Sequence, residues 1–120
     1  MSVYTVLYLF DYRKEVHSDV VDVHKSLAGA WNTTIEASKS YDKEFWTDYE
    51  ARDDREYTWT PYPEIGNFVE GTYGLSSKSK WQGDVVINGL FIDKNGTITR
   101  QIVEGEIYHT WTIELKPVKD

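Results

Sequence analysis

The chain has 120 residues, no cysteine and a formal net charge of −7, from 13 basic and 20 acidic side chains. This length is that of one domain with an ordinary core, so we expect a single domain over residues 1–120. The lack of cysteine excludes a disulfide framework and thiol chemistry, and the acidity disfavours nucleic-acid binding through phosphate neutralisation. Because no stretch is long enough to span a bilayer and the N-terminus lacks the features of a signal peptide, the sequence predicts a cytoplasmic protein.

The first residues predict a strand followed by a helix. Val3 to Tyr12 are β-branched or aromatic at most positions and apolar on both alternating sets, which indicates an interior strand near the middle of a sheet. Ser18 and Asp19 then supply an N-cap and an acidic first turn, so a helix is expected to start near Ser18. The apolar residues at helical spacing behind this cap are Val20, Val23, Leu27, Trp31 and Ile35.

The end of this helix is open between two alternatives. Gly29 interrupts the helical pattern, and residues 31–35 are poor helix formers with a fair β alternation. In the first alternative, one amphipathic helix runs to about Lys39 and packs across the sheet. In the second, the helix ends at Gly29 and a strand runs from Ala30 to Ser38.

The second alternative is connected with a family resemblance. The run Asp22 to Trp31, DVHKSLAGAW, is similar to the entry of a lipocalin-type barrel, in which a short helical lead feeds a Gly-x-Trp strand. The similarity implies a closed antiparallel barrel with an internal apolar pocket, in which Gly29 and Trp31 are structural positions that close the barrel base. A lipocalin-like all-β barrel is therefore the alternative fold.

Acidic and aromatic residues are mixed between residues 36 and 62. Glu36 to Glu56 holds eight acidic and four basic side chains, and aromatic residues make up 15% of the whole chain. Such charge runs are usually solvated surface, and the sharper interpretation is an interface with an aromatic centre. The predicted partner-binding residues are Trp46, Asp48, Tyr49, Asp53, Asp54, Trp59 and Tyr62.

Residues 57–75 predict two further strands. The first covers residues 57–60 and is ended by Pro61, because proline supplies no ladder donor and restricts the residue before it. The second covers residues 67–75. Within it, Gly71 and Gly74 indicate a bulge or a close approach of another backbone.

The last third of the chain, residues 81–115, predicts a three-strand antiparallel meander. In its first turn, Asp93 starts a type I turn and Gly96 takes the left-handed position of a bulge, which favours a three-residue loop. This register pairs Leu90 with Arg100. A two-residue loop would mix apolar with polar residues along the whole pair, so the bulged register is preferred.

A row of polar residues crosses the predicted core face of this meander. A two-residue loop at residues 104–105 places Arg100 beside His109, and polar groups on a core face cost free energy unless they are paired or hydrated. One interpretation is a cationic site for an anionic or aromatic ligand. The other is structural, with Arg100 stacked on a tryptophan or paired with a buried carboxylate, and His109 hydrogen-bonded to one backbone carbonyl. The candidate ligand-binding residues are Arg100, His109, Asn88 and Trp111.

The sequence predicts an α+β fold, with a mainly antiparallel twisted sheet, a C-terminal three-strand meander and one N-terminal helix packed on it. It contains no Gly-x-Ser-x-Gly elbow, phosphate-binding glycine loop or convergent set of metal ligands, so we expect no enzyme activity and no cofactor. We expect a small acidic interaction module that binds and inhibits or neutralises a macromolecular partner, as immunity or anti-defence proteins do. That partner would be a protein with a basic surface, with no nucleic acid or membrane bound directly. The alternative function is a small-molecule-binding sheet or barrel with its ligand in an aromatic-lined pocket.

Overall fold

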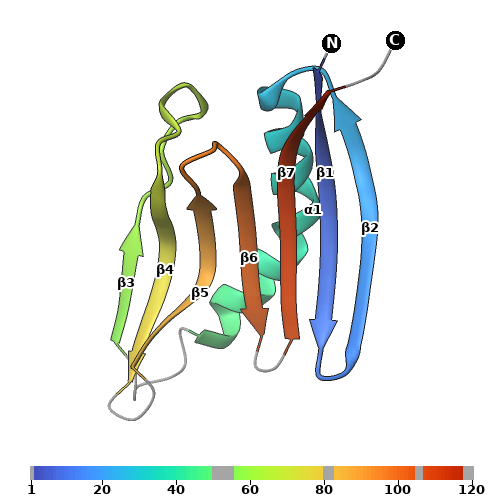
Figure 1. Cartoon of the computed structure of the whole chain (residues 1–120). Helices are drawn as coiled ribbons and strands as arrows, with labels where there is room; N and C mark the ends of the chain where they lie inside the picture. Colours follow the sequence, from blue (N-terminus) through green and yellow to red (C-terminus); the bar gives the residue numbers. More distant parts are fainter. Residues whose placement is uncertain (1, 50–55, 80–82, 105–106, 118–120) are drawn as a thin grey trace.

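The computed structural model describes residues 2–49, 56–79, 83–104 and 107–117 and has one open, seven-stranded antiparallel sheet with one α-helix packed on it (Figure 1). The strand order is β2-β1-β7-β6-β5-β4-β3. The α+β prediction is therefore confirmed. The elements are β1 (Ser2–Tyr12), β2 (Glu15–His24), α1 (Leu27–Tyr49), β3 (Glu56–Thr60), the 3₁₀-helix η1 (Ile65–Asn67), β4 (Gly71–Ser79), β5 (Gly83–Ile92), β6 (Ile98–Glu104) and β7 (Ile107–Pro117).

The lipocalin-like barrel is wrong. β2 and β3 form the two opposite edges of an open sheet, so the sheet does not close on itself. Gly29 and Trp31, which the resemblance placed at the base of a barrel, both lie in α1. The two residues instead lie in the first part of this helix, where Trp31 packs against the core and Gly29 lies close to the His24 ring.

The helix predicted to start at Ser18 is wrong, because this residue lies in the middle of strand β2. Valines that recur along residues 16–23 fit both a helical and a strand period, and pairing with β1 selects the strand. Arg13, with a φ of 56°, takes the left-handed position of the two-residue loop that joins β1 to β2. β1 is an interior strand as predicted, but it is second from the edge and not central.

The helix begins nine residues later than predicted and runs through the ambiguous segment. Ser26 caps its start, since the Gly29 amide donates to the Ser26 hydroxyl at 3.1 Å. Ala30, Thr34 and Ser38 follow at intervals of four and are fully buried against the sheet. Their small side chains let the helix approach closely, and the Thr34 and Ser38 hydroxyls donate to helix carbonyls. Residues 30–38 are therefore helical, which decides for the first of the two alternatives.

The first hairpin register of the C-terminal meander is confirmed. Leu90 pairs with Arg100, the Asp93 amide donates to the Thr97 carbonyl at 3.1 Å, and Gly96 has a φ of 82°. This is the bulged three-residue loop that the sequence predicts. The register aligns the core-facing residues of β5 and β6.

The second hairpin register is wrong by two residues. Arg100 pairs with Trp111, and His109 pairs with Ile102, so Arg100 and His109 are diagonal neighbours and not opposite one another. A shift of two residues leaves every side chain on its predicted face, because side chains in a strand alternate with a period of two. The hydrophobic pattern could therefore identify the core face but could not choose between these two registers.

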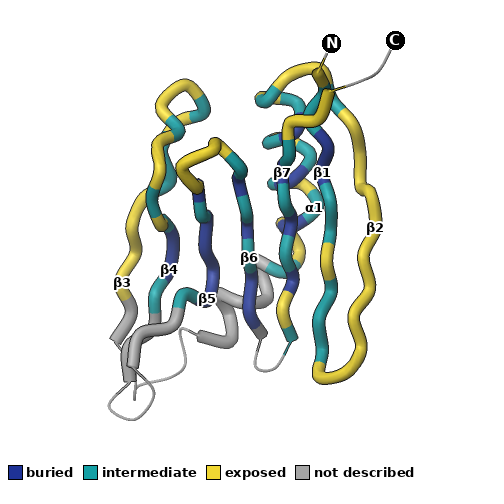
Figure 2. Tube along the Cα trace, viewed as in Figure 1, coloured by how far each residue is buried: buried dark blue, intermediate teal, exposed yellow. Residues whose placement is uncertain are grey.

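The core lies between α1 and the sheet, where buried apolar residues form two clusters. Buried segments lie in α1 and in the strands β1, β4, β5, β6 and β7 (Figure 2). α1 lies across β6, β7, β1 and β2 (Figure 1). Within the described ranges no α-helix covers the opposite face of the sheet. The first cluster contains Val6, Ala30, Leu90, Ile92, Ile98 and Ile113, and the second contains Leu75, Ile87, Ile102 and Trp111.

Gly74 confirms the close approach predicted for β4. Its φ is 108°, and a Cβ atom there would lie 2.1 Å from the Asn88 carbonyl oxygen of the neighbouring strand. We expect Gly74→Ala to lower the free energy of unfolding by about 3 kcal/mol or more, because the methyl group meets backbone that cannot move aside.

Gly96→Ala is the matched control, since this glycine is also left-handed but a Cβ atom added to it would have nothing within 4 Å. It should cost only about 1 kcal/mol. Urea unfolding of both variants measures the difference. Equal losses would show that the backbone conformation, and not the contact with β5, makes glycine necessary at residue 74.

Candidate functional site

Arg100 on β6 is the centre of a buried polar cluster that joins four parts of the fold. Its side chain is 3% exposed. Its Nε donates to the Ser38 Oγ of α1 at 3.1 Å. Its Nη1 donates to the Asn88 Oδ1 of β5 at 2.6 Å and to the Tyr62 hydroxyl at 2.5 Å. One guanidinium therefore holds the helix, two strands and the segment after β3 together.

The partners of Arg100 also satisfy one another. The Tyr62 hydroxyl donates to Asn88 Oδ1 at 3.0 Å, so this oxygen accepts from both side chains. The Arg100 Cζ atom lies 5.4 Å from the centroid of the Tyr62 ring, within range of a cation–π contact. Asn88 is fully buried, and a buried carboxamide is stable only when hydrogen-bonded. Each of these side chains is therefore hydrogen-bonded to another side chain of the fold.

His109 on β7 lies in a separate, aromatic environment. Its Nδ1 is hydrogen-bonded to the Tyr8 hydroxyl at 2.7 Å, and its ring stacks on Tyr41 with centroids 4.0 Å apart and planes at 27°. The Phe10 and Trp111 rings lie 5.7 and 6.1 Å away. Burial among these rings lowers the pKa of His109 below 6.5, because removal from water disfavours the charged imidazolium.

The four predicted ligand-binding residues all lie buried on the face that α1 packs against. Asn88 and Arg100 are in direct contact, and Arg100 and Trp111 are opposite one another in the β6–β7 ladder. The structural interpretation named a tryptophan as the ring beside Arg100, whereas the guanidinium lies over the ring of Tyr62. Sequence reasoning missed Ser38, Tyr8 and Tyr41 as neighbours of the site. Ser38 and Tyr41 could be predicted only by knowing which side of the helix faces the sheet.

The predicted partner-binding residues fall into two groups. Trp59 on β3 is 44% exposed, and its ring centroid is 5.2 Å from that of the half-buried Tyr62. Tyr62 in turn lies edge-on to Trp31, at 6.3 Å. Asp53 and Asp54 lie outside the described residues, as do the side chains of the other three predicted positions, Trp46, Asp48 and Tyr49.

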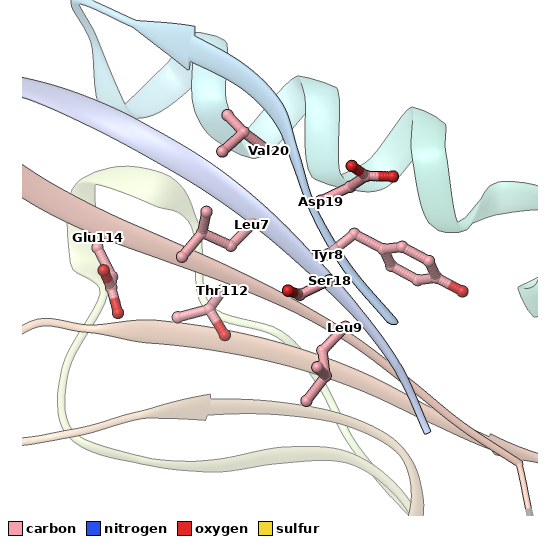
Figure 3. A pocket seen from close by; sticks show the side chains of 8 residues that line it. All are labelled: Leu7, Tyr8, Leu9, Ser18, Asp19, Val20, Thr112 and Glu114. Atoms are coloured by element: carbon pink, nitrogen blue, oxygen red, sulfur yellow. The ribbon is translucent and has the colours of Figure 1, made fainter. Parts of the chain in front are cut away.

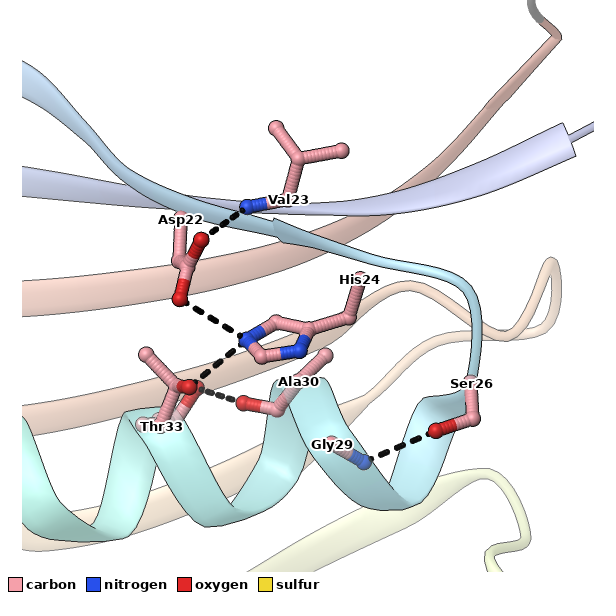
Figure 4. A network of polar contacts seen from close by, with 8 residues as sticks. Asp22, Val23, His24, Ser26, Gly29, Ala30 and Thr33 are labelled. Atoms are coloured by element: carbon pink, nitrogen blue, oxygen red, sulfur yellow. Dashed lines mark hydrogen bonds and ion pairs between the residues drawn. The ribbon is translucent and has the colours of Figure 1, made fainter.

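His24 connects the end of β2 to α1 (Figure 4). Its Nε2 lies 2.7 Å from Thr33 Oγ1 and 3.2 Å from Asp22 Oδ2. The arrangement joins strand, turn and helix through side chains that already have partners.

In the part of the chain that the structure describes, no three His, Cys, Asp or Glu side chains are grouped to hold a metal ion. No helix there has the length and apolar character needed to cross a membrane.

We expect Arg100→Leu to lower the free energy of unfolding by about 2–4 kcal/mol, because the Asn88 carboxamide oxygen would lose one of its two donors and the Ser38 hydroxyl would lose the Arg100 donor. Tyr62→Phe removes one hydroxyl and should cost about 1 kcal/mol. Chemical unfolding monitored by tryptophan fluorescence measures both changes.

The control for Arg100→Leu is Gln101→Leu, which makes a similar change one residue away, on the opposite face of the same strand. It should change stability by less than about 0.5 kcal/mol. If both leucine variants are equally stable, the hydrogen bonds of Arg100 do not hold the helix to the sheet.

The lowered pKa of His109 makes stability depend on pH. Below pH 6.5 the imidazole binds a proton more readily in the unfolded chain than in the folded chain, where its pKa is lowered. Stability should therefore fall as the pH drops through 6.5, and should level off below the lowered pKa of the folded state. His109→Phe keeps an aromatic ring against Tyr41 and removes this proton uptake, so its unfolding free energy should vary less over this pH window. Parallel curves for the two proteins would refute the assignment.

Comparison with known proteins finds no relative of this chain. No protein-family model matches it, and neither a curated protein nor a solved structure is significantly similar to it. Its function therefore has to be inferred from its own buried groups and surfaces.

Proposed function

We propose that this chain is a non-enzymatic, cytoplasmic protein-binding module that inhibits or neutralises a partner protein with a basic surface. The supporting observation is the position of Trp59, which is 44% exposed on edge strand β3 while its ring packs on Tyr62 at 5.2 Å. Exposed tryptophan and tyrosine are the residue types that contribute most binding energy at protein interfaces.

Tyr62 holds this aromatic pair in a fixed position. Its hydroxyl is hydrogen-bonded to Arg100 and Asn88, and its ring is flanked by Trp31 and Trp59. A side chain ordered before binding loses less conformational entropy when a partner arrives, so more of its contact energy appears as affinity. Arg100 and Asn88 thereby support the proposed contact surface through Tyr62, without touching the partner themselves.

Charge supports a basic partner. The net charge is −7, and the run of eight acidic and four basic residues from Glu36 to Glu56 ends three residues before Trp59. Acidic residues near an aromatic anchor accelerate association with a basic surface and disfavour acidic partners. The same charge disfavours nucleic acid as the partner.

The alternative, a small ligand held by Arg100 and His109, has less support. Both side chains are at most 4% exposed and lie on the face that α1 packs against. A ligand that replaced Ser38 or Tyr62 as the partner of Arg100 would have to compete with hydrogen bonds that the fold already makes. Binding through the exposed Trp59 requires no such displacement.

The test begins by isolating the partner with the tagged chain, identifying it by mass spectrometry and purifying it for titration. Trp59→Ala should then weaken binding by about 2 kcal/mol or more, which is roughly 30-fold in Kd. A triple charge reversal, Asp48→Lys with Asp53→Lys and Asp54→Lys, should slow association and reduce its dependence on salt.

Tyr108→Ala is the matched control, because Tyr108 is 43% exposed and lies on β7, away from the β3 edge. It should leave the affinity within about twofold of that of the unaltered chain, as expected for a residue outside the interface. Undiminished binding by both Trp59→Ala and the charge reversal would reject the proposal. A retained small molecule in the native mass spectrum, lost in Arg100→Leu, would favour the alternative.

A further inference from the structure

β2 is an edge strand whose surface is almost entirely uncovered. Nine of its ten residues are exposed, and the tube in Figure 2 is coloured as exposed along nearly its whole length. Val16 and Val20 are 57% and 61% exposed. A long edge strand rich in β-branched residues is a template for pairing with another strand unless it is protected.

The protection of β2 is confined to its second half. The ladder with β1 has a bulge between Val20 and Asp22. Beyond it, the Asp22 carboxylate accepts a hydrogen bond from the Val23 amide at 2.8 Å, as Figure 4 shows. Bulges and side chains that satisfy edge amides both prevent another strand from adding. Glu15 to Val20, in contrast, pairs regularly with β1 and has an uninterrupted outer edge.

The hairpin geometry determines which backbone groups point outward from that regular half. Tyr12 and Glu15 flank a two-residue loop and form its hydrogen-bonded pair. Because inward and outward residues alternate along an antiparallel ladder, Val16, Ser18 and Val20 turn their N–H and C=O groups to the outer edge. Three consecutive outward positions match the spacing that a further antiparallel strand requires.

The side chains of the regular half are complementary to the same segment of a second copy. We propose that two copies of this chain pair antiparallel through β2, around a two-fold axis at Ser18. Val16 of each copy then lies opposite Val20 of the other, and His17 lies opposite Asp19. Each of these opposed pairs is either apolar or an imidazole with a carboxylate, and such pairs stabilise adjacent strands.

Neighbouring registers lack this complementarity. An axis at Asp19 places two aspartates directly opposite one another, and an axis at His17 places Glu15 opposite Asp19. Like charges in opposed positions are destabilising. Of these three axes, only the one at Ser18 avoids opposed like charges and pairs the outward-facing backbone groups of Val16, Ser18 and Val20.

Pairing would also extend an apolar strip on the open face of the sheet. A hollow of about 340 Å³ lies between β2, β1 and β7, lined on that face by Leu7, Leu9, Val20 and Thr112 (Figure 3). In the paired assembly, the valines of the second copy continue this strip across the axis.

An interface of a single strand pair is small, so a dimer dissociation constant in the micromolar range is expected. Trp59 lies on the opposite edge, so dimerisation leaves it accessible.

Sedimentation velocity of the full chain from about 5 µM to about 1 mM tests the proposal, and a concentration-dependent dimer is expected. Ser18→Pro removes the outward amide nearest the axis and spares the ladder with β1, because proline is tolerated where the amide faces solvent. It should raise the dimer dissociation constant at least about tenfold, whereas Ser18→Ala keeps the amide and should leave it unchanged. Circular dichroism and the thermal midpoint verify that both variants fold.

A charge swap tests the register independently. His17→Asp places like charges opposite one another at two symmetry-related positions, so it should weaken the dimer. Adding Asp19→His to the same chain restores both pairs in exchanged order and should recover it. Rescue in the double variant is expected only if residues 17 and 19 of the two copies are opposed.

Since the chain has no cysteine, Ser18→Cys introduces a single thiol at the proposed axis. Opposed residues of a hydrogen-bonded pair have Cα atoms about 5.5 Å apart, within disulfide range, so mild oxidation should cross-link this variant. Lys25→Cys, beyond the end of β2, should stay largely uncross-linked. A monomer at every concentration, a dimer unaffected by Ser18→Pro, or a failed charge rescue would each overturn the proposal. None of these results depends on finding the partner of Trp59.

Discussion

The fold depends on keeping one buried guanidinium satisfied. Arg100 is 3% exposed, and such a group is stable only if hydrogen bonds replace the water that it has lost. Ser38 fixes the rotation of α1, Asn88 comes from β5, and Tyr62 brings the chain after β3 onto the cluster. These partners are 62, 12 and 38 residues away in sequence, so the group stabilises the tertiary arrangement more than any single element. A core of aliphatic residues alone would let the helix rotate or slide with little change in free energy, because apolar contacts have no fixed direction.

His109 and Arg100 illustrate two ways of burying a polar side chain on one face. Burial among the surrounding rings lowers the pKa of His109, and the Tyr8 hydroxyl is hydrogen-bonded to its ring. For the Arg100 guanidinium, the fold supplies side-chain oxygen acceptors from three other parts of the chain. From the sequence alone, both residues are candidates for a ligand-binding site, whereas in the structure both have partners within the fold. The surface roles proposed for this chain therefore rest on its two edges, with Trp59 near one and β2 forming the other.

The parts of the fold that the sequence predicts are those governed by local chemistry. Asp93 and Gly96 determine a turn, and that turn determines the register of β5 with β6. The second hairpin has no equally specific signal, and two registers that differ by two residues bury the same side chains. The sequence misplaces the helix because valines fit both periods and because its sheet-facing residues, Ala30, Thr34 and Ser38, are small or polar. Tertiary contact with Arg100 makes Ser38 suitable for a core position, and no periodicity in the sequence encodes that contact.

Of the candidate site, the residue identities are predictable from the sequence but their partners are not. The polar row on the core face follows from strand alternation, which singles out Asn88, Arg100 and His109. Their neighbours come from α1, from β1 and from the segment after β3, whose positions depend on packing.

The short β3 has a further consequence. It contains five residues and is followed by Pro61, so it is a poor template for adding another strand. Strand addition at β2 would therefore end with two chains and would not continue into a filament.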